Sequence, residues 1–129
     1  METEKIKVFI ADSSEVWRKI LVKHINESPD MESVGEISSN QGAVLMLEET
    51  APDVVMIDVS PNERMSLSDV VTQLKGIKPD IGIILCADKS NADNVYAAVD
   101  KGVHDVLMKP YKRVEVYRAI HGAMDKNQI

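Results

Sequence analysis

Five short apolar segments alternate along the chain with segments whose apolar residues recur at helical spacing. Each of the five is rich in β-branched or other apolar residues and no longer than a buried strand, so each predicts a strand. The strand segments are 6–11, 33–37, 54–58, 81–87 and 105–108. The segments between and after them carry apolar residues three or four positions apart, which predicts helices. These helical patterns run over 16–25, 43–47, 67–74, 95–99 and 114–124.

This order predicts a doubly wound α/β fold, a flavodoxin-like (βα)5 domain. Parallel strands need a helix-sized connection, and five such units place helices on both faces of one five-stranded parallel sheet. A chain of 129 residues with 44% hydrophobic residues has the length and the core material of one domain. No repeat or low-complexity linker interrupts it, so we expect a single domain over residues 1–129.

Capping residues indicate where the predicted helices begin and end. Ser13 or Ser14 can cap the first helix, and Pro52 ends the second from just beyond its last turn. Gly76 and Pro79 mark the end of the third.

Charge and cysteine content exclude several classes of protein. The formal net charge is -6 and the basic residues are scattered, which argues against binding of nucleic acid or of an anionic membrane surface. No apolar run approaches the roughly 20 residues needed to cross a bilayer. The single cysteine, Cys86, cannot form an internal disulfide, and the N-terminus lacks a secretory pattern. We therefore expect a cytoplasmic protein.

Charged residues gather where the predicted strands end. Asp12 follows the first strand, Asp58 ends the third, and Lys109 follows the fifth, just before Pro110. In doubly wound sheets ligands bind at the carboxyl ends of the strands, near the topological switch point. Either aspartate alone is more simply interpreted as a turn cap, but the combination with a lysine favours a functional site.

Around these residues the sequence resembles the receiver domains of two-component response regulators, the CheY-like family. The similar segments cover nearly the whole chain: KVFIADSSEVWRKIL, the run from PDMESV to VVMID that is similar to receivers of LuxR-type regulators, PDIGIILCAD and GVHDVLMKPY. The resemblance implies that Asp58 is the phosphoacceptor, modified by a histidine kinase or phosphotransfer protein. It implies a downstream output domain or protein as the second partner. Any catalysis would be limited to self-phosphorylation from a phosphodonor and autodephosphorylation.

The resemblance also implies a Mg²⁺ site and a role for the lysine. Asp12, Asp58 and the backbone carbonyl of Ser60 would hold the ion, and Lys109 would contact the phosphoryl group. The residue types suit this chemistry, because an aspartate becomes an effective nucleophile only where cations neutralise the charge that gathers beside it. A hard divalent ion does this with only one or two protein carboxylates.

The sequence departs from the family pattern around the metal. Ser13 stands where the family has a second acid, usually a direct metal ligand. Pro61 comes one position early, and the glycine of the following loop is replaced by Ser66 or Leu67. We therefore expect weak binding of Mg²⁺, since affinity depends on the number of charged ligands.

It also departs where the family transmits its signal. The ungapped match places Ala87 where a Thr or Ser hydroxyl usually contacts the phosphoryl group, with Cys86 as the neighbouring alternative. Val106 replaces the aromatic residue that usually reports phosphorylation. Neither Ala87 nor the stiff Val106 can make the usual movement. We expect little response to phosphate on the fourth helix, the fifth strand and the fifth helix.

Three interpretations remain: a phosphorylatable receiver, an atypical receiver that binds proteins independently of phosphorylation, and an unrelated flavodoxin-like enzyme or cofactor binder. The third offers no glycine-rich phosphate loop and leaves Asp12, Asp58 and Lys109 unexplained. We favour the first because the nucleophile and the lysine are both present. Cys86 and Trp17 are interpreted as packing residues.

Overall fold

Five parallel strands form one sheet in the order β2-β1-β3-β4-β5. A computed structural model describes residues 4–59, 65–91, 95 and 101–125. The strands are β1 (Ile6–Ala11), β2 (Met31–Ile37), β3 (Val54–Asp58), β4 (Gly82–Ala87) and β5 (Asp105–Met108). Every neighbouring pair is parallel. The predicted doubly wound five-stranded sheet is therefore confirmed.

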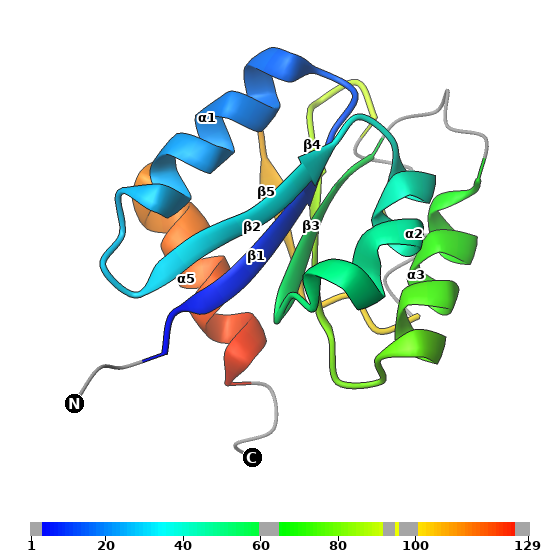
Figure 1. The fold of residues 1–129 in the computed structure, drawn as a ribbon. Coiled ribbons are helices and arrows are strands. Elements are labelled where there is room, and N and C mark those ends of the chain that lie inside the picture. The colour runs from blue at the N-terminus through cyan, green and yellow to red at the C-terminus, as the bar shows by residue number, and fades with distance from the viewer. Residues whose placement is uncertain (1–3, 60–64, 92–94, 96–100, 126–129) are drawn as a thin grey trace.

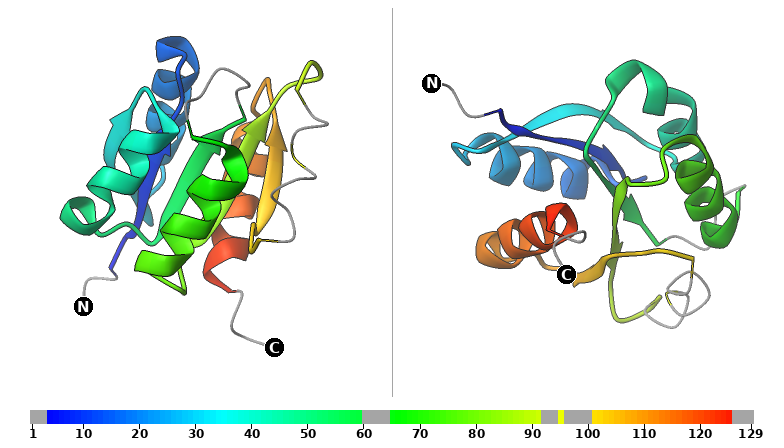
Figure 2. Two further views of the ribbon diagram at one scale, coloured as in Figure 1. Left: turned by 90° about the vertical axis from the view of Figure 1, so that its right-hand side faces the viewer. Right: turned by 90° about the horizontal axis from the view of Figure 1, so that it is seen from below.

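Helices cover both faces of this sheet (Figure 1). On one face lie α1 (Glu15–Asn26) and α5 (Arg113–Met124), and on the other α2 (Asn40–Thr50) and α3 (Leu67–Ile77). The view from below in Figure 2 shows the sheet between the two layers. The predicted helix over 95–99 falls, apart from Val95, outside the described residues. Within the described part of the chain, no helix is long and apolar enough to cross a membrane.

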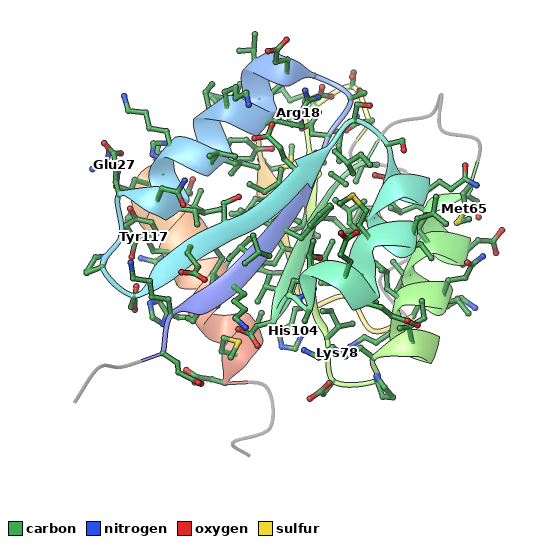
Figure 3. All side chains as sticks on the ribbon, in the orientation of Figure 1. Arg18, Glu27, Met65, Lys78, His104 and Tyr117 are labelled. Carbon is green, nitrogen blue, oxygen red and sulfur yellow. The ribbon has the colours of Figure 1, made fainter. Side chains whose placement is uncertain are left out.

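Two apolar clusters fill the spaces between sheet and helices (Figure 3). Strand β3 contributes to both, because alternate side chains of a strand point to opposite faces. Val54 and Met56 face α1 and α5, whereas Val55 and Ile57 face α2 and α3. All of β3 is buried, as expected for a parallel strand covered on both sides.

Some predicted boundaries are corrected by the structure. Strand β2 begins at Met31, two residues earlier than predicted, and its pairing with β1 shifts register between Val8 and Phe9. Gly35 lies at this irregular point, where an added Cβ would stand 2.8 Å from the ring of Phe9. Strand β4 begins at Gly82, one residue later than predicted.

The apolar stripe predicted over 114–124 faces the core only in part: Ile120 is buried and Tyr117 packs against the core. Val114 and Met124, expected to face the core, are exposed. Small residues bring the helix onto the sheet at the shifted face, whose buried members are Val116, Ala119, Ile120 and Ala123.

Serine caps fix where three helices start. The side chain of Ser14 accepts a hydrogen bond from the backbone of Trp17, so Ser14 and not Ser13 caps α1. Ser39 caps α2 and Ser66 caps α3 in the same way. The first of these caps starts α1 directly after β1, next to Asp12.

Candidate functional site

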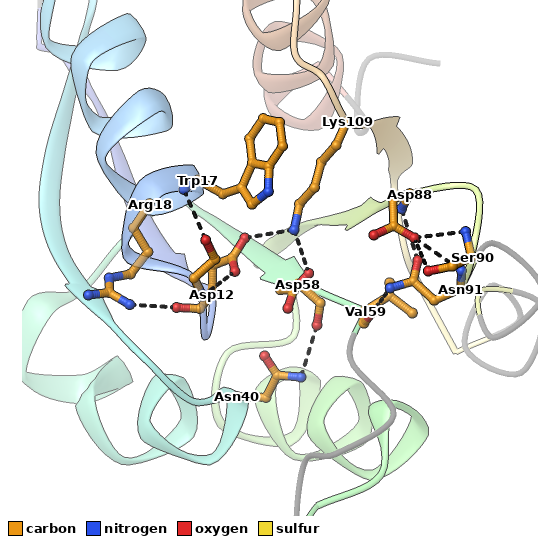
Figure 4. A network of polar contacts seen from close by, with 11 residues as sticks. Asp12, Trp17, Arg18, Asn40, Asp58, Val59, Asp88, Ser90, Asn91 and Lys109 are labelled. Carbon is orange, nitrogen blue, oxygen red and sulfur yellow. Dashed lines mark hydrogen bonds and ion pairs between the residues drawn. The ribbon is translucent and has the colours of Figure 1, made fainter.

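Three charged side chains from different strand ends meet at the carboxyl edge of the sheet (Figure 4). The Nζ atom of Lys109 lies 3.1 Å from Oδ2 of Asp12 and 2.9 Å from Oδ1 of Asp58. Asp12 directly follows β1, Asp58 ends β3, and Lys109 directly follows β5. Since β1 and β3 are adjacent in the sheet, their carboxyl ends place the two acids side by side. The structure thus brings together the three residues that the strand pattern selects.

Backbone pairing brings the lysine into place. The N–H of Lys109 donates to the carbonyl of Ala87 at 2.7 Å, which extends the pairing of β5 with β4 by one residue. The peptide bond that follows, between Lys109 and Pro110, is cis.

The three charges are almost completely withdrawn from solvent. Asp12 is 1% exposed and Asp58 5%, and the side chain of Lys109 is 8% exposed. Burial alone would lower the pKa of Lys109, but the hydrogen bond and charge of Asp58, together with Asp12, raise it above its usual value. The lysine is therefore a stable cation shared by two acids. With both acids ionised, the cluster keeps one net negative charge.

Two aromatic side chains flank the lysine on the α1 and α5 side. The centre of the Trp17 ring lies 5.4 Å from Nζ of Lys109, within the range of a cation–π contact. The edge of Trp17 meets Tyr111, with ring centres 5.4 Å apart and planes at 84°. Sequence reasoning assigned Trp17 to packing alone and missed its contact with the ammonium. Its position in the first turn of the helix that follows Asp12 was the available signal.

The backbone around both aspartates is held by polar side chains that sequence reasoning also missed. Nη1 of Arg18 donates to the carbonyl of Asp12 at 2.8 Å, and its Nε pairs with Glu36 at 3.1 Å. Nδ2 of Asn40, at the start of α2, donates to the carbonyl of Asp58 at 3.2 Å. These hydrogen bonds fix the backbone at Asp12 and Asp58, and so help to fix the position of the two carboxylates relative to each other.

A short turn after β4 reaches the same region. The side chain of Asn91 donates from Nδ2 to the carbonyl of Val59, and its Oδ1 accepts from the backbone N–H of Asp88 at 2.9 Å. These contacts are drawn at the right of Figure 4.

The residues expected to affect metal binding are only partly described. Ser13 is exposed and adjoins Asp12. Oδ1 of Asp12 accepts the N–H of Ser14 at 2.8 Å, so Asp12 also serves as the turn cap that its position suggested. Ser60 and Pro61 lie outside the described residues. Ser66, one candidate for the missing loop glycine, is the cap of α3.

The positions expected to affect signalling are well packed. Ala87 is fully buried at the end of β4 in the cluster under α2 and α3, and Val106 packs against that cluster. Cys86 pairs with Asp58 in the β3–β4 register, and its side chain lies in the opposite cluster. Burial raises the pKa of Cys86 to about 12. A neutral buried thiol fits the interpretation of Cys86 as a core residue.

The oxygen atoms at this site are suitable ligands for a hard cation, although only a few protein ligands are available. Oδ2 of Asp12 is buried and accepts no hydrogen bond from the described residues, although the Lys109 ammonium lies within ion-pair distance. Carboxylate oxygens are preferred ligands of Mg²⁺, which commonly uses one or two of them. Across the described ranges, no three His, Cys, Asp or Glu side chains gather as possible metal ligands. Asp12 and Asp58 are thus suitable ligands for Mg²⁺ by residue type, and they offer two carboxylates.

Comparison with known proteins identifies a family. The model of the response regulator receiver domain matches residues 8–121. The chemotaxis protein CheY of Listeria monocytogenes is 27% identical over 118 residues, which cover 92% of this chain and 98% of CheY. The transcriptional regulatory protein LiaR of Bacillus subtilis is 30% identical over 118 residues, 92% of this chain and 56% of LiaR.

Two further comparisons concern a longer relative and a solved structure. A protein-glutamate methylesterase/protein-glutamine glutaminase of Pyrococcus horikoshii is 30% identical over 112 residues, 87% of this chain and 30% of that protein. The chain thus spans nearly all of CheY but less than two thirds of LiaR and of the methylesterase. The signal receiver domain of the putative response regulator NarL from Mycobacterium tuberculosis has the same fold. The TM-score is 0.81, with 23% identity over 92% of this chain and 95% of that structure.

Proposed function

Since the chain belongs to the family of response regulator receiver domains, we propose that Asp58 accepts a phosphoryl group from a histidine kinase or phosphotransfer protein. The observation that carries the proposal is the buried cluster in which Asp58 shares the Lys109 ammonium with Asp12. A carboxylate next to a fixed cation and a second acid can attack phosphorus and then hold the added negative charge. The phosphodonor protein and this receiver domain would both act in the cytoplasm.

In the proposed reaction a carboxylate oxygen of Asp58 forms a bond to phosphorus as the bond from phosphorus to the donor's imidazole nitrogen breaks. The electron pair of the broken bond stays on the imidazole. In the structure the Lys109 ammonium donates a hydrogen bond to Asp58. During the reaction it would donate instead to a phosphoryl oxygen, on which negative charge develops. Trp17 and the two carboxylates keep the ammonium at this edge of the sheet.

Mg²⁺ would be held by Asp12, Asp58 and the backbone carbonyl of Ser60, and when bound would neutralise charge on the phosphoryl oxygens. The chain's own contribution is to hold the backbone that carries both carboxylates in place. Arg18 and Asn40 do this through the backbone carbonyls of Asp12 and Asp58.

The test is phosphorylation by acetyl phosphate or phosphoramidate in the presence of Mg²⁺, followed by intact mass measurement. The wild-type protein should gain one phosphoryl group, and Asp58→Asn should gain none. Asp53→Asn is the matched control, because Asp53 directly precedes β3 at its opposite end, and this variant should be modified like the wild type. An adduct that persists in Asp58→Asn would contradict the assignment.

A second candidate function is a protein-binding module that works independently of phosphorylation. It is favoured by Ala87 and Val106, which lack the hydroxyl and the ring of the usual switch. In this case an output domain or protein would bind the wild type and Asp58→Asn equally, with or without phosphodonor. A partner affinity that changes on phosphorylation would favour the first function.

A further inference from the structure

The backbone at Asp58 is held from two sides by asparagine side chains. Asn40 donates to the carbonyl of Asp58 from α2, and Asn91 donates to the carbonyl of Val59 from the turn after β4. The N–H of Val59 in turn donates to the carbonyl of Cys86 at 2.9 Å. The peptide group between Asp58 and Val59 is therefore tied to α2 and β4, and the carbonyl of Val59 is tied to the turn after β4.

The turn at 88–91 is a closed hydrogen-bonded unit. Oδ1 of Asp88 accepts from the N–H of Ser90 at 2.8 Å, from the Ser90 hydroxyl at 2.6 Å and from the N–H of Asn91 at 3.2 Å. The Asn91 side chain returns to the start of the turn through the N–H of Asp88. The amide oxygen of Asn91 therefore accepts a hydrogen bond within the turn, and its amide nitrogen donates one to the backbone next to Asp58.

This geometry makes Asn91 a rigid connection between two loops. The primary amide is planar, with its oxygen acceptor and NH₂ donor fixed at opposite corners. A displacement of the Val59 carbonyl is then passed to the N–H of Asp88. Coupling of this kind can be carried by a continuous path of physical contacts, and the hydrogen bonds of Asn91 provide one.

The path does not depend on the residues that the family uses at the end of β4. Ala87 has no polar side-chain atom, so it cannot report a change at Asp58 by a hydrogen bond of its side chain. Asn91 lies four residues further on, and its side chain contacts the backbone of Val59, directly after β3, rather than a phosphoryl group.

We propose that Asn91 is a positioning residue that couples the charge state of Asp58 to the turn at 88–91. The proposal rests on the proposed function only in taking the phosphoryl group as the natural cause of that change. Replacement of the Asp58 carboxylate by an amide removes negative charge at the position where a phosphoryl group would add it, and needs no phosphodonor, so the coupling can be measured separately.

The experiment is a double-mutant cycle read by amide chemical shifts of ¹⁵N-labelled protein. Asp58→Asn in the wild-type background should shift the backbone amides of Asp88 and Ser90 and the side-chain NH₂ of Asn91. Asn91→Asp keeps the size and the acceptor of the amide but removes the donor to Val59. In this background, and in Asn91→Ala, the response of Asp88 and Ser90 to Asp58→Asn should be lost.

Ser90→Ala is the matched control within the same turn. It removes the hydroxyl that donates to Asp88 but leaves both side-chain hydrogen bonds of Asn91, so the response to Asp58→Asn should persist. A purely structural role of Asn91 would lower the melting temperature of its variants without abolishing the response.

Two outcomes would overturn the proposal: no shift of the turn in the wild-type background, or an equal shift with and without Asn91. Failure of the proposed function is recognised independently, by the absence of a phosphoryl adduct on the wild-type protein. If the adduct is absent but the double-mutant cycle shows coupling through Asn91, the proposal stands.

Discussion

Lys109 and Asp58 lie 51 residues apart in the sequence and form a buried ion pair of 2.9 Å. The same ammonium lies 3.1 Å from Asp12, so one cation serves two carboxylates. A buried acid is stable in its charged form only beside a cation or hydrogen-bond donors. The pair therefore contributes to the fold as well as to the proposed chemistry, and substitutions here should affect both.

Removal of the cation should be strongly destabilising. Lys109→Met leaves two buried carboxylates without their ion-pair partner, which typically costs about 3–5 kcal/mol. Urea unfolding at neutral pH should show this loss. Lys112→Met is the control, because Lys112 is exposed three residues further on and its substitution should change the free energy of unfolding by less than about 0.5 kcal/mol. Equal stability of the two variants would show that the buried pair contributes nothing.

An added acid beside Asp12 should tighten metal binding. Ser13→Asp increases the ligand charge by one, and we expect the dissociation constant of Mg²⁺ to fall about tenfold, or ~1.4 kcal/mol. Isothermal titration calorimetry measures this directly. Asn26→Asp adds the same charge at the far end of α1 and should leave the affinity unchanged. No gain in Ser13→Asp would mean that another part of the site limits binding.

Phosphorylation should have little effect on the β5 and α5 surface. Ala87 and Val106 are packed apolar residues without a hydroxyl or a ring to rearrange, and a ligand shifts an equilibrium only by its differential interaction with the two states. Amide chemical shifts of β5 and α5 should change little on addition of beryllofluoride and Mg²⁺. Ala87→Ser restores a hydroxyl and should increase the response. Large changes in the wild type, or a phosphate-dependent dimer through this surface, would contradict the prediction.

The buried thiol should make stability depend on pH under alkaline conditions. Burial raises the pKa of Cys86 from 9.0 to about 12 in the folded protein, so between these values only the unfolded chain loses the thiol proton. The unfolded state is then favoured, and the free energy of unfolding should fall with rising pH by up to about 1.4 kcal/mol per unit from this group. Cys86→Ala has no thiol and therefore lacks this component.

Denaturant unfolding between pH 8 and 11 should therefore give a shallower slope for Cys86→Ala than for the wild type. Parallel slopes would show that the thiol ionises equally in both states. The native thiol should also resist alkylation at neutral pH and react after unfolding.

The three charged site residues were predictable because each adjoins a strand with a strong apolar pattern. Once 6–11, 54–58 and 105–108 are assigned as parallel strands, their carboxyl ends must share one edge of the sheet. Asp12, Asp58 and Lys109 follow from the topology before any side chain is placed.

Other features depend on contacts that leave no pattern in the sequence. Asn40 and Asn91 bond backbone carbonyls 18 and 32 residues away, and a carbonyl is the same whatever residue carries it. The apolar stripe predicted for α5 was right at Ile120, which is buried, and wrong at Val114 and Met124, which are exposed while Ala119 and Ala123 are buried. Close packing on the sheet favours the smaller pair.

Trp17 is the only tryptophan of the chain, and its ring stands 5.4 Å from the ammonium shared by the two acids. The emission of an indole depends on the electric field and the polar groups around it. A change in the position or charge balance of Lys109 therefore alters the light that the protein emits, with no label attached. The side chain that helps to hold the cation is also a built-in optical sensor of the site, and stopped-flow fluorescence can follow events there in real time.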